Sequence, residues 1–236
     1  MIMLDGFAGE HGWGAEAVAR KQRAADMGEQ PHGREIFIVD DDPVVRDLLT
    51  EVFHRAGYQV TSFVDGGSFA IAAKARIPAC VILDIYLPGR SGLEILKDID
   101  APNYPAPIFI ASGRGDIPSA VEAIKSGAFD FIEKRMEADA LVGRVHEAIK
   151  ARTQRPRESD PRPARLSRFP GSELLTRREH EVLAQIAASA TNKEAARTLG
   201  ISQRTVEIHR AHIMQKLGAK NSIDLARKVL GAGTAG

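Results

Sequence analysis

The chain has 236 residues, and 32 Lys and Arg almost balance 31 Asp and Glu, for a formal net charge of +1. This length allows one large or two small domains, and the composition is ordinary for a soluble protein. No apolar run approaches the roughly 20 residues of a membrane span, the N-terminus lacks a secretory signal pattern, and the only cysteine, Cys80, excludes an internal disulfide, so we expect a cytoplasmic protein without membrane contact.

The near-neutral total hides a charge asymmetry. Residues 151–236 carry 16 Lys and Arg and 8 Asp and Glu, a net +8, so the preceding residues carry a net −7. An acidic front and a basic back suggest a metal-binding or signalling domain joined to a nucleic-acid binder.

Strand and helix patterns alternate five times after an N-terminal extension, residues 1–33, that we expect to be poorly ordered or helical. The expected strands are 35–39, 59–63, 80–84, 108–111 and 129–132, and the expected helices are 43–56, 66–75, 91–99, 117–126 and 138–152. Repeated βα units imply a parallel sheet covered on both faces. Residues 34–152 are therefore predicted to form an α/β domain with a doubly wound, five-stranded parallel sheet.

The rest of the chain reads as a linker followed by a smaller all-α domain. Residues 153–172 are rich in proline and arginine, which predicts an extended tether. Residues 173–236 have helical patterns, with expected helices at 177–188, 192–199, 203–217 and 222–230 and expected caps at Thr176, Asn192 and Ser202. A short helix, a turn with Gly200 and a longer polar helix predict a helix-turn-helix.

Three aspartates follow apolar runs that look like buried strands. Asp40 and Asp41 end one run and Asp84 ends another, and ligands of open α/β sheets bind at this edge. Clustered carboxylates repel one another, which implies raised pKa values or a bound cation, and an all-oxygen, partly hydrated site suits Mg²⁺. Helix capping accounts for Asp42 but not for Asp40 and Asp41.

Four stretches, 38–43, 83–89, 111–113 and 130–134, together resemble the receiver domain of two-component response regulators. The resemblance implies that Asp84 accepts a phosphoryl group from a sensor histidine kinase. It implies a Mg²⁺ site formed by Asp40, Asp41, Asp84 and the backbone carbonyl of Tyr86. It also implies a phosphate-sensing and switch set formed by Ser112, Phe131 and Lys134.

One position departs from that family pattern. Receivers usually carry a proline in a cis peptide after the lysine, whereas this chain has Arg135. Since a non-proline cis peptide costs roughly 3 kcal/mol, we expect a trans Lys134–Arg135 bond. Lys134 is then expected to be displaced, or the adjoining loop reshaped.

Residues 174–230 resemble the LuxR-type helix-turn-helix of NarL/FixJ response regulators, on the stretches 192–196, 201–209 and 214–217. Val206, Ile213 and Leu217 form a helical apolar stripe, which leaves another face for a major groove. The expected base contacts are Glu207, Ile208, Arg210 and Ala211, with Arg210 able to reach either guanine or phosphate; the expected backbone contacts are Lys193, Arg204, Thr205 and Lys216. A further apolar stripe, Ile223, Ala226, Val229 and Leu230, is expected to pair two DNA-binding units, to pack within its own domain, or to do both.

These features predict a phosphorylation-controlled transcription regulator rather than an enzyme. Its expected partners are a histidine kinase, double-stranded DNA, a second copy of the chain and RNA polymerase. Two alternatives stay open. In one, the receiver serves only dimerisation; in the other, the chain is an aspartyl phosphohydrolase, although Tyr86 stands where such enzymes want a second acid.

Overall fold

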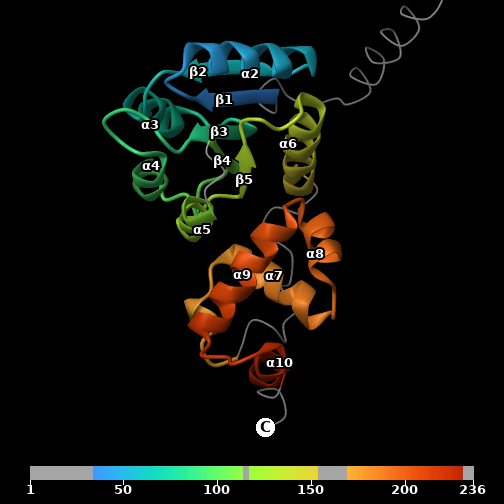
Figure 1. Cartoon of the computed structure of the whole chain (residues 1–236). Helices are drawn as coiled ribbons and strands as arrows, with labels where there is room; N and C mark the ends of the chain where they lie inside the picture. The colour runs from blue at the N-terminus through green and yellow to red at the C-terminus, as the bar shows by residue number, and fades with distance from the viewer. Residues whose placement is uncertain (1–33, 114–116, 154–168, 231–236) are drawn as a thin grey trace, which may run out of the picture.

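The computed structural model describes residues 34–113, 117–153 and 169–230. Its first part alternates strands and helices: β1 (Glu35–Val39), α2 (Pro43–Arg55), β2 (Gln59–Phe63), α3 (Gly66–Ala75), β3 (Cys80–Asp84), α4 (Gly92–Asp98), β4 (Ile108–Ser112), α5 (Ile117–Lys125), β5 (Asp130–Glu133) and α6 (Ala138–Thr153). All pairings are parallel, in the order β2-β1-β3-β4-β5 (Figure 1). The predicted extension 1–33 and residues 154–168 of the predicted linker lie outside the described residues.

Two apolar cores cover the two faces of this sheet. One joins alternate strand residues such as Ile38 and Ile82 to α2 and α6, and the other joins the intervening residues such as Val39 and Leu83 to α3, α4 and α5. Strands β3 and β4 are buried along their whole length, which explains their continuous apolar sequences. The carboxyl ends of β1 and β3, which are neighbours, therefore meet at one edge of the sheet.

The second part of the chain is helical: α7 (Arg177–Ala187), α8 (Asn192–Leu199), α9 (Gln203–Lys216) and α10 (Ser222–Leu230), preceded by a short 3₁₀ helix, η2 (Ser172–Leu174). Its core centres on Val182, Val206 and Ile213, which have no exposed surface. Phe169 is buried in the same core, so part of the predicted linker packs with these helices. Gly200 ends α8 with a φ of 67°, a left-handed conformation that suits glycine.

Local signals explain most of the helix starts. The Asp42 carboxylate caps α2 by accepting from the Val44 N–H, and Thr176 with Glu179 forms the predicted capping box of α7. The predicted cap of α8 is wrong: Thr191 caps it in a box with Glu194, and Asn192 is already helical. The hydroxyl of Thr191 reaches the free N–H of Glu194, which satisfies a group that the helix itself leaves unpaired.

The predicted apolar stripe of α10 is buried only in part. Leu225 and Val229, four residues apart, are buried against α7–α9, whereas 69% of Ile223 is exposed. Val229 of the predicted stripe thus packs within its own domain, whereas Ile223 and Ala226 are exposed, and pairing of two DNA-binding units through that face stays a prediction. No described helix is long and apolar enough to cross a membrane.

We predict that Gly92→Ala destabilises the sheet domain, because an added Cβ would lie 2.4 Å from the backbone oxygen of Asp84. Backbone atoms at that distance must move, and the expected loss in the free energy of unfolding is about 1–3 kcal/mol. Urea denaturation followed by circular dichroism measures it. The matched control is Gly143→Ala on α6, where an added Cβ meets nothing within 4 Å; equal losses for the two variants would contradict the packing at Gly92.

Candidate functional sites

The three predicted aspartates converge at the carboxyl edge of the sheet. Asp40 and Asp84 are almost fully buried, with 1% and 4% of their surface exposed, and Asp41 beside them is exposed. One carboxylate oxygen from each lies within 4.8 Å of those of the other two. Such a set of hard oxygen donors fits a partly hydrated Mg²⁺ ion, which one or two carboxylates and several waters commonly hold.

The Lys134 ammonium group joins two of these carboxylates. Its Nζ lies 2.6 Å from Asp40 Oδ2 and 2.8 Å from Asp84 Oδ2. Burial, and to a smaller extent the charge of Asp84, raise the pKa of Asp40, and the contacts with Lys134 only partly offset this. Burial also opposes the charge on Lys134, but its hydrogen bonds to Asp40 and Asp84 outweigh that effect and raise its pKa. The carboxyl edge of the sheet therefore has a positively charged Lys134 side chain beside the Asp84 carboxylate.

The remaining residues predicted for this site surround Asp84. Ser112 is fully buried at the end of β4, and its carbonyl accepts from the Lys134 N–H at 3.0 Å. The backbone N–H of Tyr86 donates to Asp84 Oδ1 at 3.3 Å, and the Tyr86 hydroxyl lies 3.4 Å from Ser119 Oγ on α5. Phe131, in the middle of β5, is half-buried beside the core on the α5 face.

The Lys134–Arg135 peptide is trans, as predicted from the absence of proline, since the described residues include no cis bond. The expected displacement of Lys134 does not occur, because its ammonium still reaches both carboxylates. Four freely rotating side-chain carbons can compensate for a changed backbone path, which explains why this single substitution leaves the cluster intact.

The residues predicted to contact DNA divide into two groups. Lys193, Arg204, Glu207 and Ala211 are exposed, although Arg204 and Glu207 also pair with each other. Arg210 and Lys216 are half-buried and bound to Asn192 and Glu179 respectively, and Thr205 and Ile208 are buried. The two buried residues face the sheet domain, so the structure does not bring all the predicted contacts together on one open surface.

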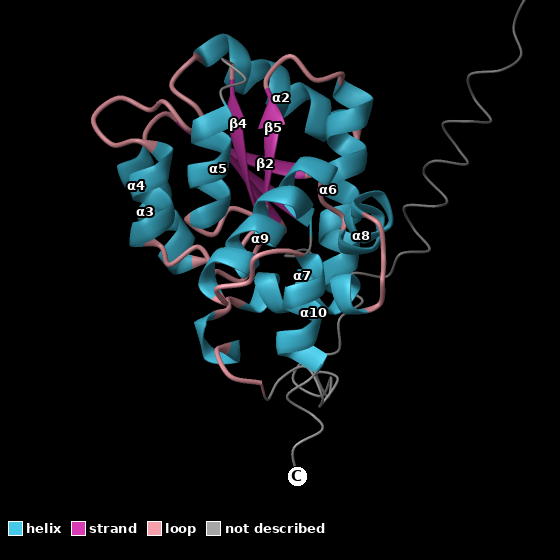
Figure 2. Ribbon diagram, turned by 60° about the horizontal axis from the view of Figure 1, so that its bottom comes forward, coloured by secondary structure: helices cyan, strands magenta, loops and turns pink. Residues whose placement is uncertain are grey.

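The start of α9 packs against the sheet domain, beside α5 and β5 (Figures 1 and 2). Ile208 joins the core cluster on the α5 face of the sheet. A second contact joins the two domains. The guanidinium of Arg178 on α7 lies 4.6 Å from the centre of the ring of Phe129, the residue before β5, within the range of a cation–π interaction.

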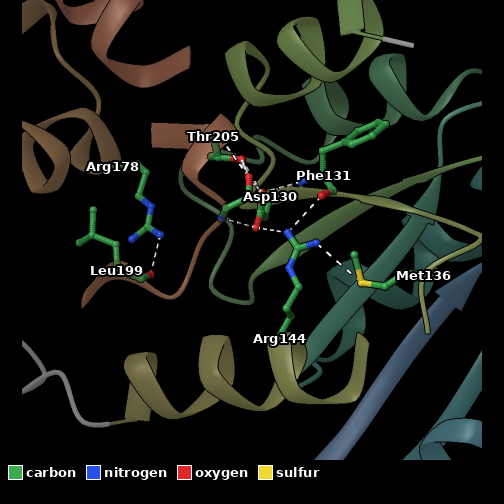
Figure 3. Close-up of polar contacts among 8 residues, drawn as sticks. Asp130, Phe131, Met136, Arg144, Arg178, Leu199 and Thr205 are labelled. Atoms are coloured by element: carbon green, nitrogen blue, oxygen red, sulfur yellow. Dashed lines mark hydrogen bonds and ion pairs between the residues drawn. The ribbon is translucent and has the colours of Figure 1, made fainter. Parts of the chain in front are cut away.

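Asp130, the first residue of β5, is the polar centre of that contact and was missed by the sequence predictions. It has no exposed surface, and it accepts hydrogen bonds from Ser202 and Thr205 at the start of α9. The Arg144 guanidinium of α6 pairs with it from the other side, so Asp130 lies between Arg144 and Thr205 (Figure 3). Its only sequence signal was an acid at the start of a buried strand.

His209 is a buried residue of α9, with 4% of its surface exposed. Burial is the main reason that the pKa of His209 falls to about 4, and the nearby Arg178 guanidinium lowers it further. His209 is therefore neutral in the folded protein near neutral pH.

The parallel sheet with its acidic, lysine-bearing edge and the attached helix-turn-helix define a response regulator with a receiver domain and a DNA-binding domain. Family models agree: residues 36–146 match the response regulator receiver domain, and residues 173–229 match the bacterial regulatory proteins of the luxR family. Both domains and their order are those predicted from the sequence.

Two regulatory proteins are similar to this chain over most of its length. Transcriptional regulatory protein FixJ of Bradyrhizobium diazoefficiens is 37% identical over 204 residues, which cover 84% of this chain and 95% of that protein. Response regulator protein TodT of Pseudomonas putida is 35% identical over 192 residues, covering 81% and 83%. The crystal structure of full-length FixJ from B. japonicum has 36% identity, 86% and 98% coverage and a TM-score of 0.48. The chain belongs to the NarL/FixJ family of response regulators.

We predict that His209 makes the helical domain sensitive to mild acid. The unfolded chain binds a proton near pH 6.5 and the folded chain only near 4, so the stabilisation is complete above pH 6.5 and is lost as the pH falls toward 4. The loss is expected to reach roughly 3 kcal/mol.

Thermal unfolding between pH 7.5 and 4 would measure this effect in the wild type and in His209→Gln, which cannot titrate there. The control is His54→Gln, at an exposed position on α2. A pH dependence in His209→Gln as steep as that of the wild type would show that other groups cause it.

Proposed function

We propose that this protein receives a phosphoryl group on Asp84 from a sensor histidine kinase and uses that event to control sequence-specific DNA binding by α9. The observation that carries the proposal is the Lys134 ammonium group held between Asp84 and Asp40, at 2.8 and 2.6 Å, in a chain that also has the LuxR-type domain. A receiver without signalling chemistry would have no need to bury two carboxylates beside one lysine.

Asp84 is the residue best placed to be the nucleophile. Its Oδ would attack the phosphorus of a phosphohistidine, forming a P–O bond while the P–N bond breaks and the histidine of the kinase leaves. Lys134 is a point charge that would move from the carboxylates toward the new phosphoryl oxygens, and the hydroxyl of Ser112 would donate to one of them. Asp40, Asp41 and the Tyr86 carbonyl would hold Mg²⁺, whose charge neutralises the phosphoryl oxygens.

The DNA-binding role rests on the exposed residues of α8 and α9. Glu207 and Ala211 are exposed on α9, where they could meet base edges in a major groove, and Lys193 is exposed at the start of α8, where it could meet a phosphate. The burial of Thr205 and Ile208 against the receiver means that this arrangement cannot present the whole helix to DNA. We infer that it is the unphosphorylated form and that phosphorylation favours separation of the two domains.

Separation would expose the surface of α5 and β5, and we infer that two receivers then pair through it as a homodimer bound to a symmetric site. Such a regulator would work in the cytoplasm and could contact RNA polymerase. The alternative in which the receiver serves only dimerisation would gain support if Arg135 displaced Lys134 from the site. The contact between Lys134 and Asp84 gives it none. The phosphohydrolase alternative gains none, because Tyr86 still offers no second acid.

We predict that Asp84→Asn abolishes phosphorylation. Purified protein incubated with Mg²⁺ and radiolabelled acetyl phosphate, or with a phosphorylated histidine kinase, should acquire an acid-stable, alkali-labile label in the wild type only. Asp41→Asn should label at least tenfold less because one metal ligand is weakened. Exposed Asp47 on α2 gives a matched control, Asp47→Asn, that should label normally; label on Asp84→Asn would refute the assignment.

For DNA we expect two different signatures. Glu207→Ala should change the preferred base pair at one position, with a change of about 1–3 kcal/mol in discrimination. Lys193→Ala should weaken every sequence alike and reduce the salt slope by about 1.

Binding selections from a random-sequence DNA pool with the beryllofluoride-activated variants, followed by salt titrations, measure both effects. If both variants weaken all sequences equally, the roles assigned to Glu207 and Lys193 are wrong.

A further inference from the structure

The first turn of α9 binds a carboxylate that comes from the receiver. The Ser202 N–H donates to Asp130 Oδ2 at 2.9 Å, the Ser202 hydroxyl donates to Asp130 Oδ1 at 3.1 Å, and the Thr205 hydroxyl donates to the same Oδ1. Backbone and hydroxyl donors at the start of a 14-residue helix, α9, favour an anion because the positive end of the helix dipole lies there. This carboxylate has no exposed surface, so water does not weaken the contact.

Backbone N–H groups, Ser and Thr hydroxyls and helix N-termini are also among the groups that contact phosphates of the DNA backbone. We propose that Asp130 occupies the phosphate position at the start of α9, so that receiver and DNA compete for the same donor atoms. The proposal rests on the proposed DNA-binding function. The proposal goes beyond that function by naming a residue. The receiver would block α9 not only by covering the helix but also by placing Asp130 where a DNA phosphate would bind.

If Asp130 substitutes for a phosphate, α9 must be able to release it at a low cost in free energy. The ion pair between Asp130 and Arg144 keeps that cost low. A buried carboxylate that loses its partners normally costs several kcal/mol. Asp130 keeps its ion pair with Arg144, which belongs to the receiver, after α9 has left. The Arg144 guanidinium also donates to the Phe131 carbonyl at 3.1 Å, which holds it at this end of β5 (Figure 3). Separation therefore leaves no unpaired buried charge.

Strand β5 connects this contact to the phosphorylation site. Asp130 begins the strand and Lys134 follows its last residue, Glu133, so their backbone positions lie about 13 Å apart at 3.3 Å per residue. Between them Phe131 donates its N–H to Asp130 Oδ1 at 2.9 Å. A shift of Lys134 toward a phosphoryl group, or a rotation of Phe131, would thus act directly on the residue that holds α9.

The test is the DNA affinity of the unphosphorylated Asp130→Asn variant, measured by fluorescence anisotropy with a short mixed-sequence duplex. Asn keeps the size of the side chain and removes its charge. We expect roughly tenfold tighter binding than by the unphosphorylated wild type, within the usual range of coupling between two sites. Small-angle scattering should show a larger radius of gyration, and beryllofluoride should add little further affinity.

The matched control is Asp47→Asn, which makes the same change in net charge on the exposed surface of α2. An equal gain in this variant would mean that the effect is general electrostatic attraction, and would overturn the proposal. So would an unchanged affinity of Asp130→Asn while beryllofluoride strengthens DNA binding by the wild type. If no form binds DNA, activated wild type included, the proposed function itself fails.

A second variant approaches the contact from α9 and keeps the proposal testable if Asp130→Asn does not fold. Thr205→Val removes a hydroxyl that we assign to both Asp130 and DNA phosphate. It should expand the unphosphorylated protein in scattering and also weaken DNA binding by the activated protein several-fold. A compact unphosphorylated form, or full affinity in the activated form, would contradict the shared use of this hydroxyl.

Discussion

The attraction between the Lys134 ammonium group and the carboxylates of Asp40 and Asp84 is the interaction on which the account depends. Two buried acids repel each other, and burial raises the pKa of Asp40, so without a cation the edge of the sheet could not keep its charge. Lys134 supplies that cation at 2.6 and 2.8 Å. Because it also follows β5 directly, we expect a change of charge at Asp84 to act on the end of this strand.

Strand β5 is four residues long, Asp130–Glu133, and has a functional group at each end. Lys134 follows it at the proposed phosphorylation site, and Asp130 begins it at the contact with α9. A short element with two such ends can couple two sites without a long chain of intermediates. The coupling is of the kind expected for a two-state protein, in which one event favours the arrangement that exposes the recognition helix.

Much of the receiver was predictable, because buried parallel strands have continuous apolar sequences and end at acids such as Asp40 and Asp84. The helix positions followed from caps such as Thr176, whose side chain bonds to Glu179 in the same helix. What could not be predicted depends on contacts between distant residues. The Thr205 hydroxyl donates to Asp130, 75 positions earlier in the chain, and the residues around either position do not indicate this contact. The burial of Leu225 on α10 was not predicted, because the buried face of a helix depends on the elements that pack against it, and these contacts are not local in the sequence.

The most direct test of the account is hydrogen–deuterium exchange of the wild-type protein with Mg²⁺, with and without beryllofluoride. On activation, peptides from the first turns of α9 should lose protection, whereas the core around Val182 in α7 should keep it. Unchanged exchange at the start of α9, in a protein that fluorine NMR shows to hold the phosphoryl analogue at Asp84, would contradict the link between Asp84 and α9.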